Sequence, residues 1–132
     1  MTAAVMGLLD TTVFIALESG REIGELPEET VTSVVVLGEL EVGVLAASGS
    51  EVRARRLDTL RSVGDLTVLP IDEEVASVWA QMRVHLAESG RRVNVNDAWI
   101  AATAAAHRIP VVSQDDDFDP LEGVADLAVI KV

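Results

Sequence analysis

The sequence predicts an α/β domain of three layers, in which helices cover both faces of a mostly parallel central sheet. Short apolar segments alternate with segments of helical periodicity along the whole chain. Strands separated by helices pair in parallel, because each connection must cross back over the sheet. The length of 132 residues is usual for one domain, so we expect residues 1–132 to form a single domain.

A strand and a helix open the chain. Val5–Leu9 is short and apolar, and Asp10 follows it as a helix-start signal. The expected helix runs toward Gly20 and carries the apolar residues Phe14, Ile15 and Leu17. Arg21–Glu29 is polar and contains both glycine and proline, which predicts a loop.

The next segment predicts a second strand and a helix. Thr30–Val35 is rich in β-branched residues, and from Val36 the apolar period becomes helical. The apolar stripe of this helix consists of Val36, Leu40, Gly43, Val44 and Ala47. Glu39 falls at the edge of the stripe and Glu41 nearly opposite it, so we expect Glu39 beside the packed face and Glu41 in water.

Two helices and a strand follow. Glu51–Val63 has a helical pattern, and Leu66–Leu69 reads as the third strand. Asp72 is a favourable N-cap for a helix that ends at Gly90. The apolar stripe of that helix consists of Val75, Trp79, Met82 and Leu86.

The last part of the chain completes the alternation. Asn96 is the N-cap candidate of an alanine-rich helix that reaches His107. Pro110–Ser113 and Leu127–Val132 are the fourth and fifth expected strands.

The charge balance is strongly acidic. Twenty-two acidic residues against ten basic ones give a net charge of −12, which as a whole repels nucleic acid. The acids therefore either serve solubility or gather to bind a hard divalent cation. The absence of cysteine excludes disulfides and thiolate metal sites. Neither a membrane span nor a secretory signal is evident, so we expect a cytoplasmic protein with no membrane partner.

Four acidic residues are expected at one edge of the sheet. Asp10 and Asp115 follow the first and fourth strands, Asp97 begins a helix, and Glu39 lies one turn into another. The carboxyl ends of parallel strands form the ligand crevice of such folds. Converging like charges are costly without a cation, so Mg²⁺ or Mn²⁺ is the expected occupant. Such a site activates water against a phosphodiester.

Each of these acids also has a purely structural interpretation. Asp10 and Asp97 suit the first turn of a helix, Glu39 suits a partly exposed edge, and Asp115–Asp117 suits a solvated turn. Other sites fit poorly. The acidic cluster lacks the glycine of a calcium loop, and the chain has no glycine-rich phosphate loop.

Four motifs, in order, resemble the PIN-domain ribonucleases of the VapC toxin type. They are Leu9-Asp10-Thr11-Thr12-Val13-Phe14-Ile15, Leu37-Gly38-Glu39-Leu40-Glu41-Val42-Gly43, Asn96-Asp97-Ala98-Trp99-Ile100-Ala101-Ala102 and Val112-Ser113-Gln114-Asp115-Asp116-Asp117-Phe118. The carboxylates of that family fall on Asp10, Glu39, Asp97 and Asp115. Ser113 stands where the family more often has Thr, which keeps the hydroxyl.

The resemblance implies a PIN-like fold and a Mg²⁺-dependent endoribonuclease, the toxic member of a type II toxin–antitoxin pair. Asp10 and Asp97 would hold the metal, with Glu39 and Asp115 completing the site and Asp117 as a substitute or supplement. Thr11, Thr12 and Ser113 would support it by hydrogen bonds. The implied partners are RNA, a VapB-type antitoxin over the second and third helices, and a second copy of the chain.

Two questions stay open at this stage. Basic residues that RNA phosphates could contact are Arg53, Arg55, Arg56, Arg91 and Arg92. For each of them, a solvated surface charge is the more common explanation. The alternative to an enzyme is a non-catalytic PIN-like module that binds RNA or protein without turnover.

Overall fold

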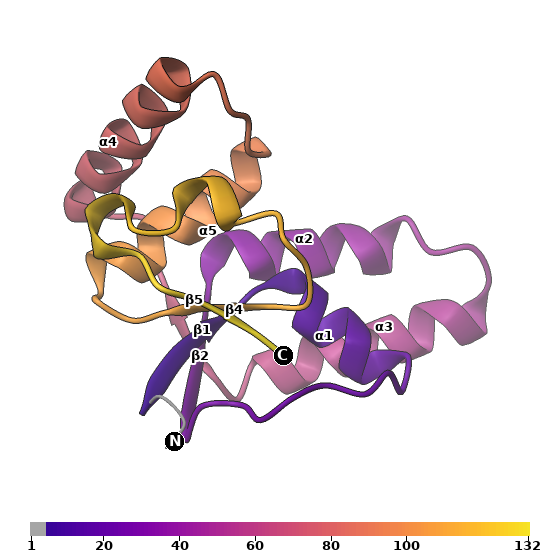
Figure 1. Cartoon of the computed structure of the whole chain (residues 1–132). Helices are drawn as coiled ribbons and strands as arrows, with labels where there is room; N and C mark the ends of the chain where they lie inside the picture. Colours follow the sequence, from indigo (N-terminus) through magenta and orange to yellow (C-terminus); the bar gives the residue numbers. More distant parts are fainter. Residues whose placement is uncertain (1–4) are drawn as a thin grey trace.

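The computed structural model describes residues 5–132 (Figure 1). Within this range, none of the helices combines the length and the hydrophobicity needed to cross a bilayer. The elements in chain order are β1 (Met6–Leu9), α1 (Thr11–Glu18), β2 (Glu29–Ser33), α2 (Val34–Leu45), α3 (Ser50–Val63), β3 (Thr67–Leu69), α4 (Glu73–Ser89), α5 (Val95–Ala106), β4 (Val111–Ser113), the 3₁₀ turns η1 (Asp119–Leu121) and η2 (Val124–Asp126), and β5 (Val129–Lys131).

The strands form one five-stranded sheet in the order β3-β2-β1-β4-β5. Every neighbouring pair is parallel, which confirms the predicted α/β class and makes the sheet wholly rather than mostly parallel. β1 is the central strand, and its residues Leu8 and Leu9 are buried. Such burial on both faces explains why the strands read as continuous apolar runs.

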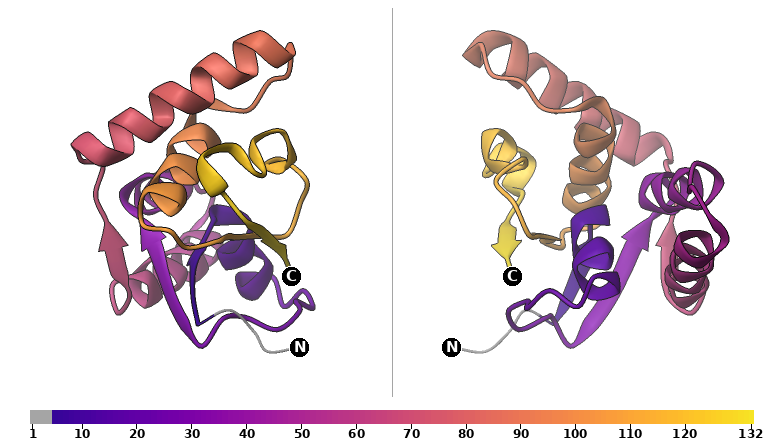
Figure 2. Two further views of the ribbon diagram at one scale, coloured as in Figure 1. Left: turned by 60° about the vertical axis from the view of Figure 1, so that its left-hand side comes forward. Right: turned by 90° about the vertical axis from the view of Figure 1, so that its right-hand side faces the viewer.

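Helices cover both faces of this sheet. The chain steps from β1 to β2 to β3 in one direction and then returns to β4 and β5 on the other side of β1. Because parallel crossovers are right-handed, steps in opposite directions place their helices on opposite faces. α1, α2 and α3 accordingly pack together, while α4 packs on α5 and η2 (Figures 1 and 2).

The alanine-rich helix α5 lies between α4 and the sheet. Apart from Trp99, its side chains from Ala98 to Ala105 are almost wholly buried, and the small size of the alanines permits a close approach of neighbouring elements. Trp99 of α5 stacks on Trp79 of α4 with ring centroids 4.4 Å apart and planes inclined by 4°. Both rings are partly buried against the core, as the apolar stripe of α4 predicted for Trp79.

The second strand ends earlier than predicted. We expected Thr30–Val35, but β2 stops at Ser33 and α2 begins at Val34. The hydroxyl of Ser33 accepts a hydrogen bond from the backbone N–H of Val36 at 3.2 Å, so Ser33 is the N-cap of α2. The β-branched residues after Ser33 therefore begin a helix, because capping and burial of Val36 outweigh their strand propensity.

The cap of α5 was also predicted wrongly. The N-cap is Asn94 and not Asn96, since the Asn94 side chain accepts from the backbone N–H of Asn96 at 2.9 Å. Both residues are of a preferred capping type, and the backbone leaves the extended region at the earlier one. Asp97 consequently lies in the first turn of α5.

This difference predicts unequal effects of two matched substitutions. Asn94→Ala removes the cap and is expected to lower the free energy of unfolding by about 1 kcal/mol. Asn96→Ala is expected to change it by less than about 0.5 kcal/mol, because its side chain is exposed and caps nothing. Urea denaturation of both variants checks this, and a larger loss for Asn96→Ala would contradict the assigned cap.

Candidate active site

The strand order creates a crevice between the carboxyl ends of β1 and β4. The connections from these two neighbouring strands leave toward opposite faces, which is where open α/β sheets bind ligands. Leu9 is the register partner of Val112, so the residues that follow, Asp10 and Ser113, lie side by side. The crevice is thus lined from its base by a carboxylate and a hydroxyl.

Asp10 is both a helix cap and a buried acid facing this crevice. Its side chain is 3% exposed. One carboxylate oxygen accepts from the backbone N–H and the hydroxyl of Thr12, at 3.1 and 2.6 Å, and the other accepts from the Ser113 hydroxyl at 3.0 Å. Burial raises the pKa of Asp10 to about 6, although the hydrogen bonds from Thr12 and Ser113 oppose the rise.

The hydroxyl groups around Asp10 are themselves held in place. The Thr12 hydroxyl accepts from the backbone N–H of Gln114 at 3.0 Å and lies 3.3 Å from the Ser113 hydroxyl. Thr11 points instead to α2, where its hydroxyl donates to Oε1 of Glu39 at 2.6 Å. Glu39 is half-buried and Glu41 is exposed, as the helical phase predicts.

The pKa of Asp97 is affected by the charges of all the other candidate acids. Burial, followed by the charges of Glu39, Asp10, Asp117 and Asp115 in that order, raises its pKa to about 7. Its place in the first turn of α5 favours the charged form, but burial and like charges outweigh that effect. The structure therefore brings together acids from the ends of β1 and β4 and from α2 and α5.

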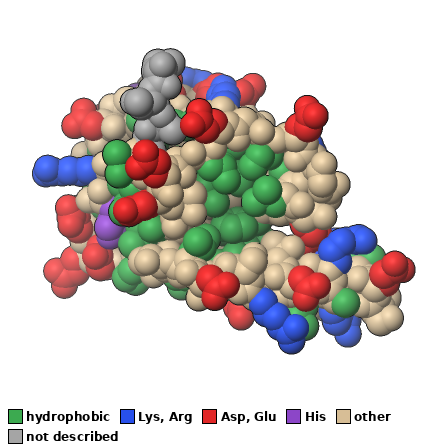
Figure 3. Space-filling model, turned by 90° about the horizontal axis from the view of Figure 1, so that it is seen from below, with side chains coloured by type: hydrophobic (Ala, Val, Ile, Leu, Met, Phe, Trp, Pro, Cys, Tyr) green, Lys and Arg blue, Asp and Glu red, His purple; other side chains and the backbone are tan. Residues whose placement is uncertain are grey.

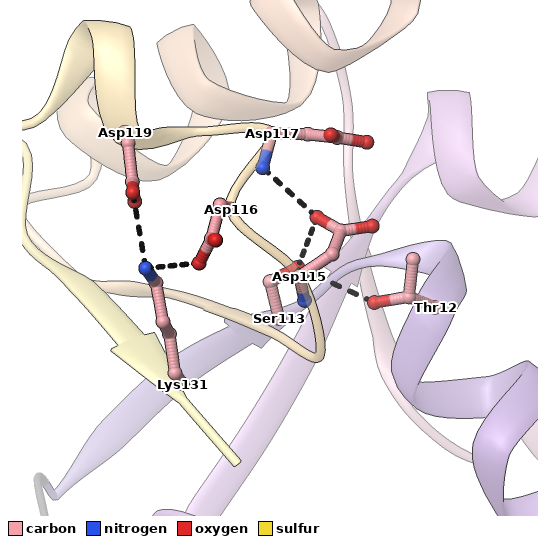
Figure 4. Close-up of polar contacts among 7 residues, drawn as sticks. All are labelled: Thr12, Ser113, Asp115, Asp116, Asp117, Asp119 and Lys131. Carbon is pink, nitrogen blue, oxygen red and sulfur yellow. Dashed lines mark hydrogen bonds and ion pairs between the residues drawn. The ribbon is translucent and has the colours of Figure 1, made fainter.

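The acidic turn after β4 divides its carboxylates between two directions (Figure 4). Asp115 contacts the Ser113 hydroxyl at 3.3 Å and accepts from the backbone N–H of Asp117 at 3.0 Å. Asp116 and Asp119 instead contact the ammonium of Lys131, with Asp119 at 3.0 Å. Asp116 thus turns toward Lys131 of β5. Sequence reasoning missed Lys131, whose only signal was its uniqueness as the sole lysine of the chain.

The candidate arginines fall into two groups. On α3, Arg53 and Arg56 donate to the backbone carbonyls of Ala47 and Gly43, at 3.2 and 2.7 Å, and so stabilise the end of α2 and the turn after it. Arg55 is exposed, and no hydrogen bond or ion pair ties its guanidinium to the rest of residues 5–132. Arg91 and Arg92 lie in the loop between α4 and α5.

A cavity of about 410 Å³ joins that loop to the acids. It is lined by Arg91, Arg92, Asn94 and Asp97 on one side and by Asp116, Asp117 and Asp119 of the acidic turn on the other. The left-handed backbone of Gly90, with φ of 68°, ends α4 and reverses the chain just before the two arginines. Arg91 and Arg92 therefore border the cavity that contains Asp97.

The acids suit a divalent cation by their chemistry. Carboxylate oxygens are the ligands that Mg²⁺ and Mn²⁺ prefer. Among residues 5–132, no ion pair neutralises Asp10, Glu39, Asp97 or Asp115. In the same part of the chain, no three acidic or histidine side chains converge closely enough to form a finished metal cage.

Comparisons with known proteins identify the family. A family model described as PIN domain matches residues 7–123. Ribonuclease VapC5 of Mycobacterium tuberculosis is 54% identical to the chain, over 99% of the chain and 98% of the relative. The chain belongs to the VapC family of PIN-domain proteins. Ribonuclease VapC4 of the same organism is 44% identical to this VapC-family chain, over 89% of it and 92% of the relative.

Solved structures agree with the VapC assignment. The crystal structure of VapBC-5, a toxin–antitoxin system from Mycobacterium tuberculosis, contains a chain that matches with a TM-score of 0.91 and 52% identity, over 97% of this chain and 99% of that one. FitAcB from Neisseria gonorrhoeae matches with a TM-score of 0.73 and 29% identity, over 95% and 96%. The PIN-like fold and the family expected from the four motifs are thereby confirmed.

The raised pKa values predict how the stability of this VapC-family chain depends on pH without metal. Asp10 and Asp97 have pKa values of about 6 and about 7 in the folded chain, against 3.8 for an unperturbed Asp. The folded state then binds protons that the unfolded state releases, so stability is expected to fall as pH rises from about 4 to about 7. The stability of Asp97→Asn should fall less steeply with pH. This variant should also be more stable than wild type at about pH 7.5, because like-charge repulsion is reduced.

Thermal melts in a chelating buffer across this pH range check the prediction. The matched control is Asp58→Asn, which removes an exposed carboxylate of α3 away from the crevice. Parallel pH profiles for wild type and Asp97→Asn would contradict the assigned electrostatics.

Proposed function

We propose that this chain is a Mg²⁺-dependent endoribonuclease and the toxic member of a toxin–antitoxin pair. The observation that carries the proposal is the group of unneutralised acids at the carboxyl ends of β1 and β4, in a chain 54% identical to Ribonuclease VapC5. Mn²⁺ has the same ligand preference and would substitute for Mg²⁺.

Asp10 and Asp97 are the residues we propose as principal metal ligands. Glu39 and Asp115 complete the site. The raised pKa of Asp97 supports its assignment as a ligand, because this carboxylate gains most when a cation offsets the charges of its neighbours. A bound divalent cation supplies Lewis-acid stabilisation of the phosphodiester and lowers the pKa of water. Asp117 is the supplementary acid, and its charge raises the pKa of Asp97 more than that of Asp115 does.

The other residues of the crevice have supporting tasks in this proposal. Thr12 and Ser113 hold the Asp10 carboxylate by donating to both of its oxygens. Thr11 fixes Glu39 in the same way. With these donors in place, the acids lose little side-chain freedom when the substrate binds, which is the value of preorganisation at a reacting site.

Substitution of the acids tests the assignment. Asp10→Asn, Asp97→Asn and Glu39→Gln are each expected to reduce RNA cleavage by more than about a hundredfold, since even outer-shell partners of metal ligands are worth roughly ten to a hundredfold. Glu41→Gln is the matched control, because Glu41 lies on the same helix but is exposed and should leave cleavage unchanged.

The measurement is gel analysis of total cellular RNA incubated with the purified, antitoxin-free chain in Mg²⁺, beside a chelated sample. Fragments in the Mg²⁺ sample alone support the nuclease. Intact RNA in every sample, with a folded protein, would instead favour the non-catalytic binding module.

We propose that Arg91 and Arg92 bind phosphates of the RNA next to the scissile one. Both border the cavity that contains Asp97, and both are exposed. The net charge of −12 means that the attraction must come from such local groups and from the metal. Arg53 and Arg56 are already engaged by backbone carbonyls, which leaves them a structural task.

Arg91→Gln and Arg92→Gln are expected to raise KM for RNA with little change in kcat. Each should also reduce the slope of log affinity against log salt by about 0.7, the value for one phosphate contact with a single strand. Arg21→Gln is the control, because Arg21 is exposed beyond the far end of α1. Unchanged KM and salt slope in both variants would remove these arginines from the RNA site.

A VapB-type antitoxin is the protein partner we propose. Large apolar side chains remain exposed on α1 and α2, among them Ile15, Val42 and Leu45. Between α1, α2 and α3 a cavity of about 210 Å³ is lined by Thr11, Ile15, Glu39 and Arg56, so it opens beside the acids. The face seen from below exposes an apolar patch with charged side chains at its edges (Figure 3). Exposed apolar surface of this kind suits an antitoxin or a second copy of the chain.

A further inference from the structure

Lys131 occupies a fixed position beside the acidic turn. It is the last residue of β5 and the register partner of Ser113, whose hydroxyl binds Asp10. The backbone N–H of the next residue, Val132, donates to the carbonyl of Ser113 at 3.0 Å. The sheet therefore sets the place from which the Lys131 side chain reaches the turn.

The turn concentrates four acids in five positions, 115 to 119. Their mutual repulsion favours any rearrangement that spreads them apart. The one ammonium of Lys131 contacts two of them, Asp116 and Asp119 (Figure 4). The other two, Asp115 and Asp117, point away from Lys131 and are linked to each other by the bond from the Asp117 backbone N–H.

We propose that Lys131 is a positioning residue, which holds Asp116 and Asp119 toward β5 so that Asp115 and Asp117 stay directed toward Asp97 and its metal. This inference rests on the proposed function. Lys131 contacts neither Asp97 nor Asp115, so it acts through the conformation of the turn. A surface ion pair of this kind contributes little to global stability, and its effect is local.

A purely electrostatic role and a positioning role for Lys131 predict opposite effects on the binding of a divalent cation, which makes the inference testable. Removing a cation near an acidic site should tighten the binding of a divalent cation if only the overall field matters. If Lys131 positions the turn, its removal should weaken that binding. Lys131→Gln is therefore expected to raise the Kd for Mn²⁺ roughly tenfold, the low end for residues that orient metal ligands.

The experiment is a titration of the full chain with Mn²⁺ alone, with no RNA present. Lys131→Arg is expected to restore wild-type affinity, because a guanidinium reaches the same two carboxylates. Arg61→Gln is the matched control: it removes the same charge from an exposed ion pair, with Asp58 at 4.0 Å, and should leave the Kd unchanged. Hydrogen exchange of the Asp117 amide should speed up in Lys131→Gln, while the melting temperature stays near that of wild type.

The outcomes separate this inference from the proposed function. Mn²⁺ affinity that is equal or tighter in Lys131→Gln would overturn the positioning role alone. A raised KM for RNA with unaltered Mn²⁺ affinity would also overturn it, and would make Lys131 a contact for the substrate. A wild-type chain that binds no Mn²⁺ would overturn the proposed metal site itself.

Discussion

The buried carboxylate of Asp10 joins the three elements around which the crevice is built. Asp10 directly follows β1, and its carboxylate caps α1 through Thr12 and reaches β4 through Ser113. These bonds join β1 to β4, the two neighbouring strands whose connections leave toward opposite faces of the sheet. They therefore fix the separation of β1 and β4 where the ligand crevice opens. Because a buried carboxylate is costly without such donors, the two hydroxyl groups are as necessary to the fold as to the crevice.

The burial of these carboxylates also has an electrostatic consequence. The hydrogen bonds to Asp10 compensate part of its burial, but the charges of four acids act on Asp97, and no cation within residues 5–132 is paired with it. Without metal, a proton is therefore the means by which the crevice reduces its charge near neutral pH. In the proposed metal site, metal and proton would compete for the same carboxylates, and folding, protonation and metal binding would be coupled in one group of residues.

Sequence reasoning succeeded where position along a strand decided the outcome. Asp10 and Asp115 follow strands, and parallel pairing alone brings such residues to one edge. Sequence reasoning failed for the N-cap of α5, because the two candidates, Asn94 and Asn96, are the same residue type and differ only in backbone geometry. The contact of Lys131 with Asp116 and Asp119 depends on the register of β5 against β4, which no local pattern encodes.

The stacked rings of Trp79 and Trp99 have a spectroscopic consequence. They are the only two tryptophans of the chain, and they link α4 to α5 two residues beyond Asp97. Parallel indole rings at 4.4 Å couple their electronic transitions, so the near-ultraviolet circular dichroism of this chain arises largely from one contact. The helix that carries Asp97 therefore contains its own optical reporter, and any shift of α5 against α4 changes that signal without an added label.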